Sequence, residues 1–482
     1  MGAERLAVPR RTAFTFAALT LWLAAIVLVR PLSVDESQYV ASVALTARGL
    51  LPYRDFAYLQ MPLQPFVFAP LQWLFAGHLL LAMRLANALL GLVGVMFVYA
   101  AARRAGANER AAVVAAMLLV ACESFAWCAG VARNDMLPTA LMGLGLWLIA
   151  KGGRFAAGLA FGLAASAKIS YAVPAATLCL TGLWTTDVAE RRHALVFAAG
   201  LTIGLLPSLL LAALAPRAFL TEVIVFPATA PSQYYIGIGK AWRLGPARFV
   251  QLIEAAAVGP ALIASIEVAR RASKERWLNN PFRRAMLAAA IGGLLSAGLN
   301  KPFQIFYLLP ALPPLFVLAG LMFNEGKGRP LRVQGVWALF LAIGLAPVAG
   351  WFIRAANTGV APALDAERRS EALGAALRAQ HVDGAVATLA GQYIPGQIDL
   401  RFAAGPFLYR TQGFMSAEQA REWRIVTRDQ ARSLADQPPT AIVTGAYPDA
   451  QPAEERELAI QARSLGYRPV AEAGGFTVWK RP

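Results

Sequence analysis

The sequence predicts a mainly α-helical, polytopic membrane protein that ends in a small α/β domain. Of its 482 residues, 57% are hydrophobic and only 15% are charged, and the mean hydropathy is +0.51. A soluble domain carries about 25% charged residues, so this balance favours a membrane helix bundle. The apolar residues gather in successive runs, and a spanning helix takes roughly 20 of them.

We expect about eleven spans. They cover residues 13–31, 79–102, 111–128, 136–150, 154–167, 169–185, 194–215, 248–269, 285–299, 303–323 and 334–353. The stretch from 154 to 185 is short for two crossings, and a re-entrant hairpin there would invert the topology of everything that follows. The strongly basic loop 270–284 argues against that inversion, because it would move that loop to the outer side.

Charge differs between the two sides of the predicted bundle. Lys and Arg gather in the loops at 103–110, 151–154, 191–192, 270–284 and 327–332. Cytoplasmic loops are enriched in these residues, so we expect a plasma (inner) membrane protein with a cytoplasmic N-terminus. The first apolar run has no cleavage site and is interpreted as an uncleaved span. These loops hold much of the net charge of +17, which therefore does not indicate nucleic-acid binding.

Two segments outside the spans are predicted to fold. Residues 62–78 are apolar but contain Pro62, Pro65 and Pro70, which is typical of interfacial helices rather than of a span. After residue 356 the chain becomes richer in charged residues. β-like runs at 385–389, 441–444 and 477–480 alternate with helical runs at 365–380, 417–434 and 453–465. We therefore divide the chain into a membrane domain, 1–356, and a small extracytoplasmic α/β domain, 357–482.

The segment 33–65 follows the first span and is unusually polar for this chain. Ser33 and Glu36 have the spacing of a capping box, in which Ser33 accepts from a backbone N–H three residues on and Glu36 reaches back. Asp35 and Glu36 would then lie in the first turn of a helix that ends near Gly49. Asp55 follows in a loop rich in proline and aromatic residues. The alternative to a catalytic role for these carboxylates is helix capping in a solvated loop.

Four further charged residues lie beside predicted spans on the outer side. Arg133 and Asp135 precede the span at 136–150; as residues two apart on a helix they need not pair, and Asp135 could simply cap that helix. Lys168 and Lys301 could snorkel to the interface. Together, however, these cations could hold a lipid phosphate, and the outer carboxylates could act as a general base. The cysteines and histidines show no metal-ligand spacing.

Several of these motifs resemble those of the GT-C membrane glycosyltransferases, in particular the family of protein O-mannosyltransferases and lipid A aminoarabinose transferases. The resemblance covers about residues 13–320. Its motifs, in the same order as in the family, are Asp35–Glu36 with Tyr39, the run from Gly49 to Asp55 before Pro62–Leu63, Arg133-x-Asp135, Gly158 to Gly162 before Lys168, and Lys301 with Tyr307 and Pro310. The chain departs from the family near Pro62, which Tyr58-Leu59-Gln60-Met61 precede, and in its small C-terminal domain.

The resemblance implies a mechanism. The donor would be a sugar on a polyprenyl phosphate, and the acceptor an extracytoplasmic glycolipid, polysaccharide or protein. Asp35 would be the general base of an inverting transfer, supported by Glu36. Arg133, Lys168 and Lys301 would bind the donor phosphate, and Asp55, Asp135, Tyr39 and Tyr307 would orient the substrates. A carboxylate at a helix N-terminus is a weak base, so Asp35 would act late in the reaction, or Asp135 in its place.

Two other functions compete with this one. A flippase for lipid-linked sugars would also need apolar helices and buried cations, but transporters commonly show repeated halves and midplane polar groups, and neither is seen here. The second alternative is a non-catalytic scaffold whose outer domain binds partners. The sequence leaves open the sugar, the acceptor and a possible divalent metal on the carboxylates; no other cofactor is expected.

Overall fold

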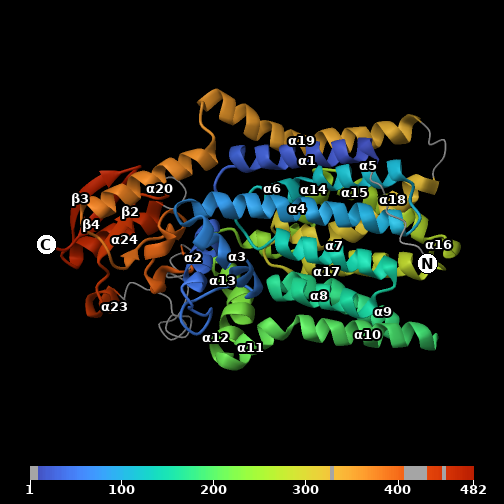
Figure 1. Ribbon diagram of the computed structural model, residues 1–482, viewed down its shortest axis with the longest axis horizontal. Helices are drawn as coiled ribbons and strands as arrows, with labels where there is room; N and C mark the ends of the chain where they lie inside the picture. The colour runs from blue at the N-terminus through green and yellow to red at the C-terminus, as the bar shows by residue number, and fades with distance from the viewer. Residues whose placement is uncertain (1–8, 326–330, 406–430, 448–451) are drawn as a thin grey trace.

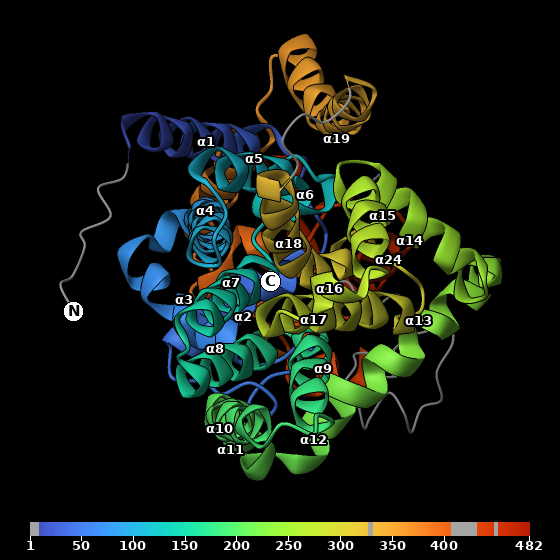
Figure 2. The ribbon, with the colours of Figure 1, turned by 90° about the vertical axis from the view of Figure 1, so that its right-hand side faces the viewer.

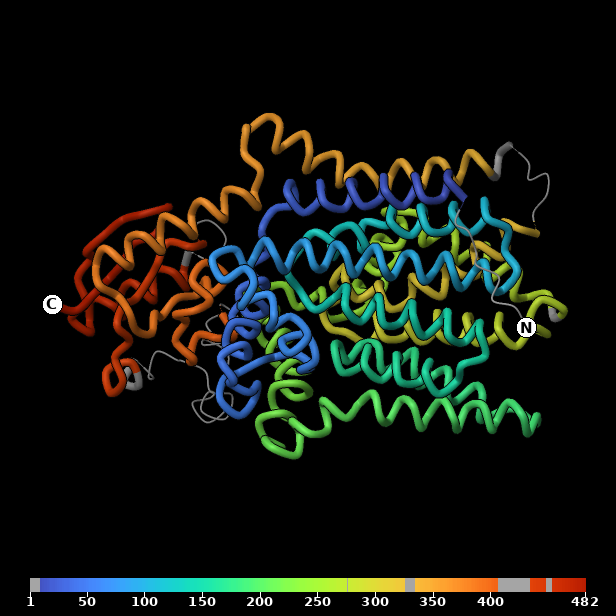
Figure 3. The backbone as a smooth tube through the Cα atoms, in the orientation of Figure 1, coloured from blue at the N-terminus to red at the C-terminus, as the bar shows by residue number. Residues whose placement is uncertain are grey.

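The computed structural model describes residues 9–325, 331–405, 431–447 and 452–482. Figure 1 shows long, roughly parallel helices that form a bundle, with the C-terminal domain packed against one end of it. We call this the domain end. The helix termini that carry Arg104, Lys151, Arg154 and Arg284 lie at the opposite end, which we call the basic end; the first helix of the bundle also begins there (Figures 1 and 3).

The bundle contains single helices and bent pairs. The single helices are α1 (Arg10–Val29), α4 (Leu79–Arg104), α7 (Met136–Lys151), α8 (Arg154–Ala167), α9 (Ala172–Leu183), α17 (Pro281–Leu299), α18 (Leu312–Glu325) and α19 (Leu331–Thr358). The pairs are α5 (Glu109–Val120) with α6 (Glu123–Ala129), α10 (Val188–Gly204) with α11 (Leu206–Leu214), and α14 (Ala247–Ala257) with α15 (Ala261–Ala272). In the described part of the chain, 5 helices could each cross a membrane, and the pairs raise this to 8. Three shorter apolar helices complete the predicted eleven.

Three of the predicted spans are not straight helices. The pair α5–α6 bends by 70°, α10–α11 by 46° and α14–α15 by 97°. The largest bend falls at Gly259, whose φ of +130° favours glycine, and is followed by Pro260. Another lies beside Pro207, at the start of α11. By contrast, the short run 154–185 does form two helices, with a break at Lys168, whose backbone is extended.

Short helices cover the domain end. They include α2 (Glu36–Ala47), α3 (Leu63–Leu74), α12 (Pro216–Leu220), a π-helical turn (Thr221–Val225) and α13 (Phe226–Gly237). In Figure 1 α2, α3 and α13 lie between the long helices and the C-terminal domain, so the segment predicted to hold interfacial helices is placed at the end of the bundle. Helix α2 is buried from Glu36 to Thr46, and thus is a core element rather than a solvated one.

The C-terminal domain is a small sheet with helices packed on it. Its strands are β1 (Val386–Ala387), β2 (Ala441–Thr444), β3 (Arg468–Ala473) and β4 (Phe476–Lys480), and its longer helices are α20 (Pro362–Ala379) and α24 (Pro452–Ser464). The sheet order is β1-β2-β4-β3, with β1 parallel to β2 and the other pairs antiparallel. The turn between β3 and β4 is Gly474–Gly475, both at positive φ as a two-residue hairpin requires.

Three of these four strands are predicted from the sequence, and β3 is missed because it is an edge strand that is mostly exposed. The predicted helix 417–434 lies largely outside the described residues; α23 (Ala431–Asp436) overlaps its end. The two domains share a hydrophobic core, which includes Tyr39 and Val40 of α2 together with Ala366, Ile398 and Phe476. A Cβ at Gly405 would overlap the Ser37 hydroxyl, so the C-terminal domain fits closely against α2.

Helices α8 and α10 are held together by glycines. Gly158 and Gly162 of α8 face Gly200 and Gly204 of α10, and a Cβ at any of the four would overlap backbone of the facing helix. This close approach is the small-xxx-small packing of membrane helices. It fixes the end of α8, from which Lys168 follows directly.

We expect Gly162→Ala to destabilise the protein by about 1–3 kcal/mol, because the new methyl group must push α8 and α10 apart. Thermal unfolding of the purified protein in detergent measures the effect. Gly350→Ala in α19 is the matched control, since a Cβ there meets nothing within 4 Å. Equal unfolding temperatures for the two variants would contradict this packing.

Candidate active site

The site begins where the chain enters α2. Glu36 Oε2 accepts a hydrogen bond of 2.7 Å from the Ser33 backbone N–H, as the capping box predicts. The Ser33 hydroxyl, however, accepts from Asp35 N at 3.4 Å and not from the N–H three residues on. Asp35 is the N-cap residue of α2, yet its side chain makes no capping bond. Its carboxylate is therefore available to another partner.

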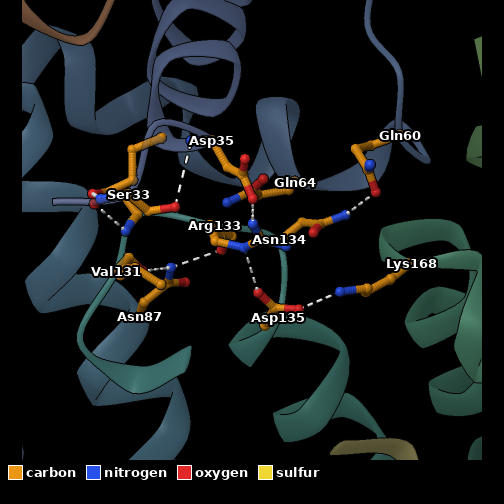
Figure 4. Close-up of polar contacts among 12 residues, drawn as sticks. Ser33, Asp35, Gln60, Gln64, Asn87, Val131, Arg133, Asn134, Asp135 and Lys168 are labelled. Atoms are coloured by element: carbon orange, nitrogen blue, oxygen red, sulfur yellow. Dashed lines mark hydrogen bonds and ion pairs between the residues drawn. The ribbon is translucent and has the colours of Figure 1, made fainter. Parts of the chain in front are cut away.

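That partner is Arg133, which opens a chain of four alternating charges (Figure 4). Arg133 Nη1 pairs with Asp35 Oδ2, and Arg133 Nε lies 3.0 Å from Asp135 Oδ2. Lys168 Nζ pairs with the other oxygen of Asp135. Side-chain exposure falls from 20% at Asp35 to 7% at Lys168, 3% at Arg133 and zero at Asp135. Asp35 is thus the most accessible member of this ion-pair chain.

Arg133 and Asp135 do pair, although the sequence suggested that they need not. The expectation assumed a helix, but residues 131–135 form a loop before α7, and there residues two apart can face each other. Asp135 is the N-cap residue of α7, but its side chain makes no capping bond. Both aspartates thus occupy capping positions while their carboxylates bind cations, which argues against capping as their function.

Buried polar side chains fix the 131–135 loop. Glu36 is fully buried and accepts from Ala132 N at 2.7 Å, while Arg84 donates to both of its oxygens at 2.7 and 2.6 Å. Asn87 donates to the carbonyl oxygens of Val131 and Arg133 at 2.6 and 2.7 Å. Each oxygen of Glu36 thus accepts from two donors, and these contacts give it a positioning role for the loop that carries Arg133.

Opposing effects act on Asp135. Burial alone raises the pKa of its carboxyl, but the neighbouring Lys168 and Arg133 outweigh burial and hold the pKa below its ordinary value. Asp135 is therefore a carboxylate with both oxygens bound to cations. Such a group is a poor proton acceptor. Of the two aspartates in the ion-pair chain, Asp35 is therefore better suited to act as a base.

Aromatic rings surround the cations. The ring of Phe306 lies 4.1 Å from the Arg133 guanidinium and 4.7 Å from Lys168 Nζ, and Tyr307 is 5.9 Å from the same ammonium. The Tyr39 ring lies 5.6 Å from the Arg133 guanidinium. Burial raises the pKa of Tyr39 well above its ordinary value, so it remains a neutral phenol. Phe306 and Tyr307 belong to the 3-10 helix Ile305–Ala311 that precedes α18.

A cavity of about 210 Å³ opens beside Lys168. Its polar lining comes from Lys168, Gln60, Ser170, Ser296, Asn300 and Tyr307, and its apolar lining from Leu59, Met61, Ile169, Val173, Val223, Pro227 and Leu299. The Ser170 hydroxyl is buried and has no hydrogen-bond partner in the described structure. The cavity thus joins a cation to an apolar wall, a combination that suits the phosphate end of a lipid.

The structure brings together Asp35, Arg133, Asp135 and Lys168, with Tyr39 and Tyr307 beside them. Asp55 lies outside the ion-pair chain: it accepts from Leu51 N at 2.7 Å and pairs with Arg54 at 2.8 Å in its own turn. Lys301 is exposed in the loop after α17, next to the cavity residue Asn300. In the described residues no three His, Cys, Asp or Glu side chains converge as a metal site would require.

Sequence reasoning missed several buried polar residues around the site. Arg84 and Asn87 are fully buried in α4, where a charged residue in a predicted span was itself a signal. Asn134 links Gln60 to the end of α8 by bonds of 3.1 Å to Gln60 Oε1 and the Ala167 carbonyl oxygen. Glu222, in the π-helical turn, accepts from Tyr58 N at 2.7 Å. No sequence pattern indicated the role of Glu222, because it lies in an outer segment that is 164 positions from Tyr58.

Residues 58–297 match the family model of glycosyltransferase family 87. The whole fold is similar to the crystal structure of ArnT from Cupriavidus metallidurans bound to undecaprenyl phosphate, with a TM-score of 0.60, 20% identity and 97% of each chain covered. The chain thus has the fold of the GT-C membrane glycosyltransferases. The matched range includes Arg133, Asp135 and Lys168, while Asp35 and Glu36 precede it.

Two further structures share this fold. Apo ArnT from the same organism matches with a TM-score of 0.52 and 20% identity over 97% of each chain. The apo oligosaccharyltransferase of Archaeoglobus fulgidus matches with a TM-score of 0.51 and 12% identity, over 93% of this chain and 71% of that one. None of the curated proteins compared matches the sequence. The predicted membrane bundle and the predicted GT-C resemblance are confirmed.

Proposed function

We propose that this glycosyltransferase moves a sugar from a polyprenyl phosphate to an extracytoplasmic acceptor, with inversion at the anomeric carbon. The observation that carries the proposal is the ion-pair chain at the mouth of a partly apolar cavity, at the domain end of a membrane bundle. ArnT, whose fold is similar, is described as bound to undecaprenyl phosphate.

The donor phosphate binds at Lys168. Its ammonium has three donors and borders the cavity, whose apolar wall of Leu59, Val173 and Leu299 receives the first part of the polyprenyl chain. Arg133 contacts the same Phe306 ring and supplies the second cation. Tyr307 lines the cavity, and Lys301 directly follows the lining residue Asn300. These groups stabilise the charge that the departing polyprenyl phosphate gains in the transition state.

The acceptor hydroxyl binds at Asp35. As the hydroxyl oxygen forms its bond to the anomeric carbon, the bond from that carbon to the phosphate oxygen breaks, and the hydroxyl proton passes to Asp35. Of the four side chains in the ion-pair chain, that of Asp35 is the most exposed to solvent. Its carboxylate is paired with Arg133, and a donor phosphate that competes for that cation releases the carboxylate for the acceptor proton, which ties proton removal to donor binding.

The other predicted residues act around this step. Asp135 holds Arg133 and Lys168 at a fixed separation, and Glu36 positions the loop beneath them. Tyr39 packs against Arg133, and Asp55 orders the loop that precedes α3. The acceptor is a glycolipid, polysaccharide or protein, and it reaches Asp35 from the side of the C-terminal domain.

The orientation follows from charge. Basic residues gather at the end of the bundle opposite to the site, and cytoplasmic loops are enriched in Lys and Arg. We therefore place the basic end and the N-terminus in the cytoplasm, with the site and the C-terminal domain on the outer side of the plasma (inner) membrane.

The test is a transfer assay with purified protein in proteoliposomes and a panel of radiolabelled polyprenyl-phosphate sugars. We expect free polyprenyl phosphate to accumulate as label moves to an acceptor from a cell-envelope extract. Parallel assays with EDTA and with added Mn²⁺ decide whether a divalent cation takes part. Movement of the intact lipid-linked sugar across the bilayer, without cleavage, would instead favour a flippase.

A further inference from the structure

A second cavity lies at the basic end, far from the ion-pair chain. It has a volume of about 520 Å³ and is enclosed by α8, α9, α10 and α17, with the end of α7. Figure 2 looks at the molecule from this side and shows these helices grouped together. The residues that line it include Ile149, Arg154, Leu178, Trp184, Glu190 and Arg284.

The lining is amphipathic and carries excess positive charge. Ile149, Leu178 and Phe197 form apolar wall, while Arg154 and Arg284 are the two arginines of the polar lining. Glu190 pairs with Arg284 and is the one carboxylate among the lining residues. Arg154 donates to the Ile149 carbonyl oxygen at 3.3 Å, but its buried Nε has no hydrogen-bond partner in the described structure. An anion at the rim would satisfy that donor.

The surface around the cavity is one that faces lipid. Trp184, which lines the cavity, is 88% exposed, and its neighbours Leu180 and Val188 are 53% and 77% exposed. Tryptophan is enriched at the membrane interface, and large apolar side chains on an exposed helix surface indicate contact with lipid chains. A ligand that enters from this surface therefore needs an apolar part as well as an anionic one.

We propose that this cavity binds an anionic glycerophospholipid, with the phosphate of its head group between Arg154 and Arg284 and its first acyl carbons against Leu178 and Phe197. Basic pockets between helices are suited to such head groups. Glu190 competes with the phosphate for Arg284 and so limits the affinity. The site is separate from the donor cavity, and the proposal does not depend on the proposed function.

The experiment is native mass spectrometry of the full-length protein in detergent, titrated with phosphatidylglycerol and, separately, with phosphatidylcholine. Since each cation near a membrane surface contributes about a fivefold gain in affinity for anionic lipid, we expect Arg154→Gln/Arg284→Gln to bind phosphatidylglycerol roughly 25-fold more weakly. The matched control is Lys151→Gln/Arg192→Gln. It removes two exposed cations from the same end without altering the cavity lining, and should change the affinity less than about twofold.

Glu190→Gln gives a result of opposite sign, which misfolding cannot imitate. It removes the competing carboxylate, so binding of phosphatidylglycerol should become about fivefold tighter. Three outcomes would overturn the proposal: wild-type affinity in Arg154→Gln/Arg284→Gln, equal affinity for phosphatidylcholine in the wild type, or weaker binding in Glu190→Gln.

Discussion

Replacing Asp35 by Asn is expected to lower the rate of sugar transfer by about 10²–10⁴-fold, the usual contribution of a general base. Asparagine keeps the size of the side chain and can still accept from Arg133, but it cannot take the acceptor proton. Because Asp35 does not cap α2, the substitution should leave the helix intact. The measurement is the initial rate of polyprenyl phosphate release in proteoliposomes.

Asp365→Asn is the matched control, because this aspartate is exposed in α20 and forms an ion pair of 3.6 Å with Arg368. It should transfer sugar at the wild-type rate. Donor binding by Asp35→Asn should be at least as tight as in the wild type, since Lys168 and Arg133 remain and the carboxylate that competes for Arg133 is gone. If Asp35→Asn keeps more than about a tenth of the wild-type rate, well above the range for loss of a general base, Asp35 is not the base and the mechanism must be revised.

The second large effect is on stability. Glu36→Gln leaves the buried Arg84 guanidinium without a carboxylate, and breaking a buried ion pair costs about 3–5 kcal/mol. Both side chains are inaccessible to solvent in this structure. We therefore expect a marked fall in unfolding temperature in detergent, together with reduced transfer because the 131–135 loop loses its anchor.

The double variant Glu36→Gln/Arg84→Met distinguishes the cost of an unpaired buried charge from the cost of altered side-chain packing. Removing the uncompensated cation should return part of the lost stability, so the two single effects will not add. If instead the double variant loses the sum of the single losses, the pair does not act as a unit. Glu325→Gln is the comparison, since its ion pairs with Arg271 and Arg283 are partly exposed and should contribute about 1 kcal/mol or less.

Much of the bundle could be predicted because long apolar runs and basic loops are local features of the sequence. The run at 154–167 coincides with α8, and the first strand-like runs of the C-terminal domain coincide with β1 and β2. What could not be predicted depends on tertiary contacts. The bend between α5 and α6 has no glycine or proline beside it, and α2 is buried because the C-terminal domain packs against it.

The site, too, could be predicted only as far as local features of the sequence allow. The sequence selected Asp35, Arg133, Asp135 and Lys168 by residue type and side of the membrane, but it did not show that they form one chain of ion pairs. It grouped Glu36 with Asp35, whereas Glu36 is fully buried and binds Arg84. Apart from the Arg133–Asp135 pair, these contacts join residues that are 33 to 98 positions apart, and no local pattern encodes them.

In the proposed mechanism, Arg133 and Lys168 hold the phosphate of a polyprenyl-linked donor. Mass spectrometry of the lipids that co-purify with the protein tests it most directly, comparing the wild type with Arg133→Ala/Lys168→Ala. The control Arg48→Ala/Lys240→Ala removes two exposed cations from the domain end. We expect a polyprenyl phosphate, or its sugar conjugate, in the wild type and in the control, and its loss from Arg133→Ala/Lys168→Ala. Retention of the same lipid by that variant would contradict it.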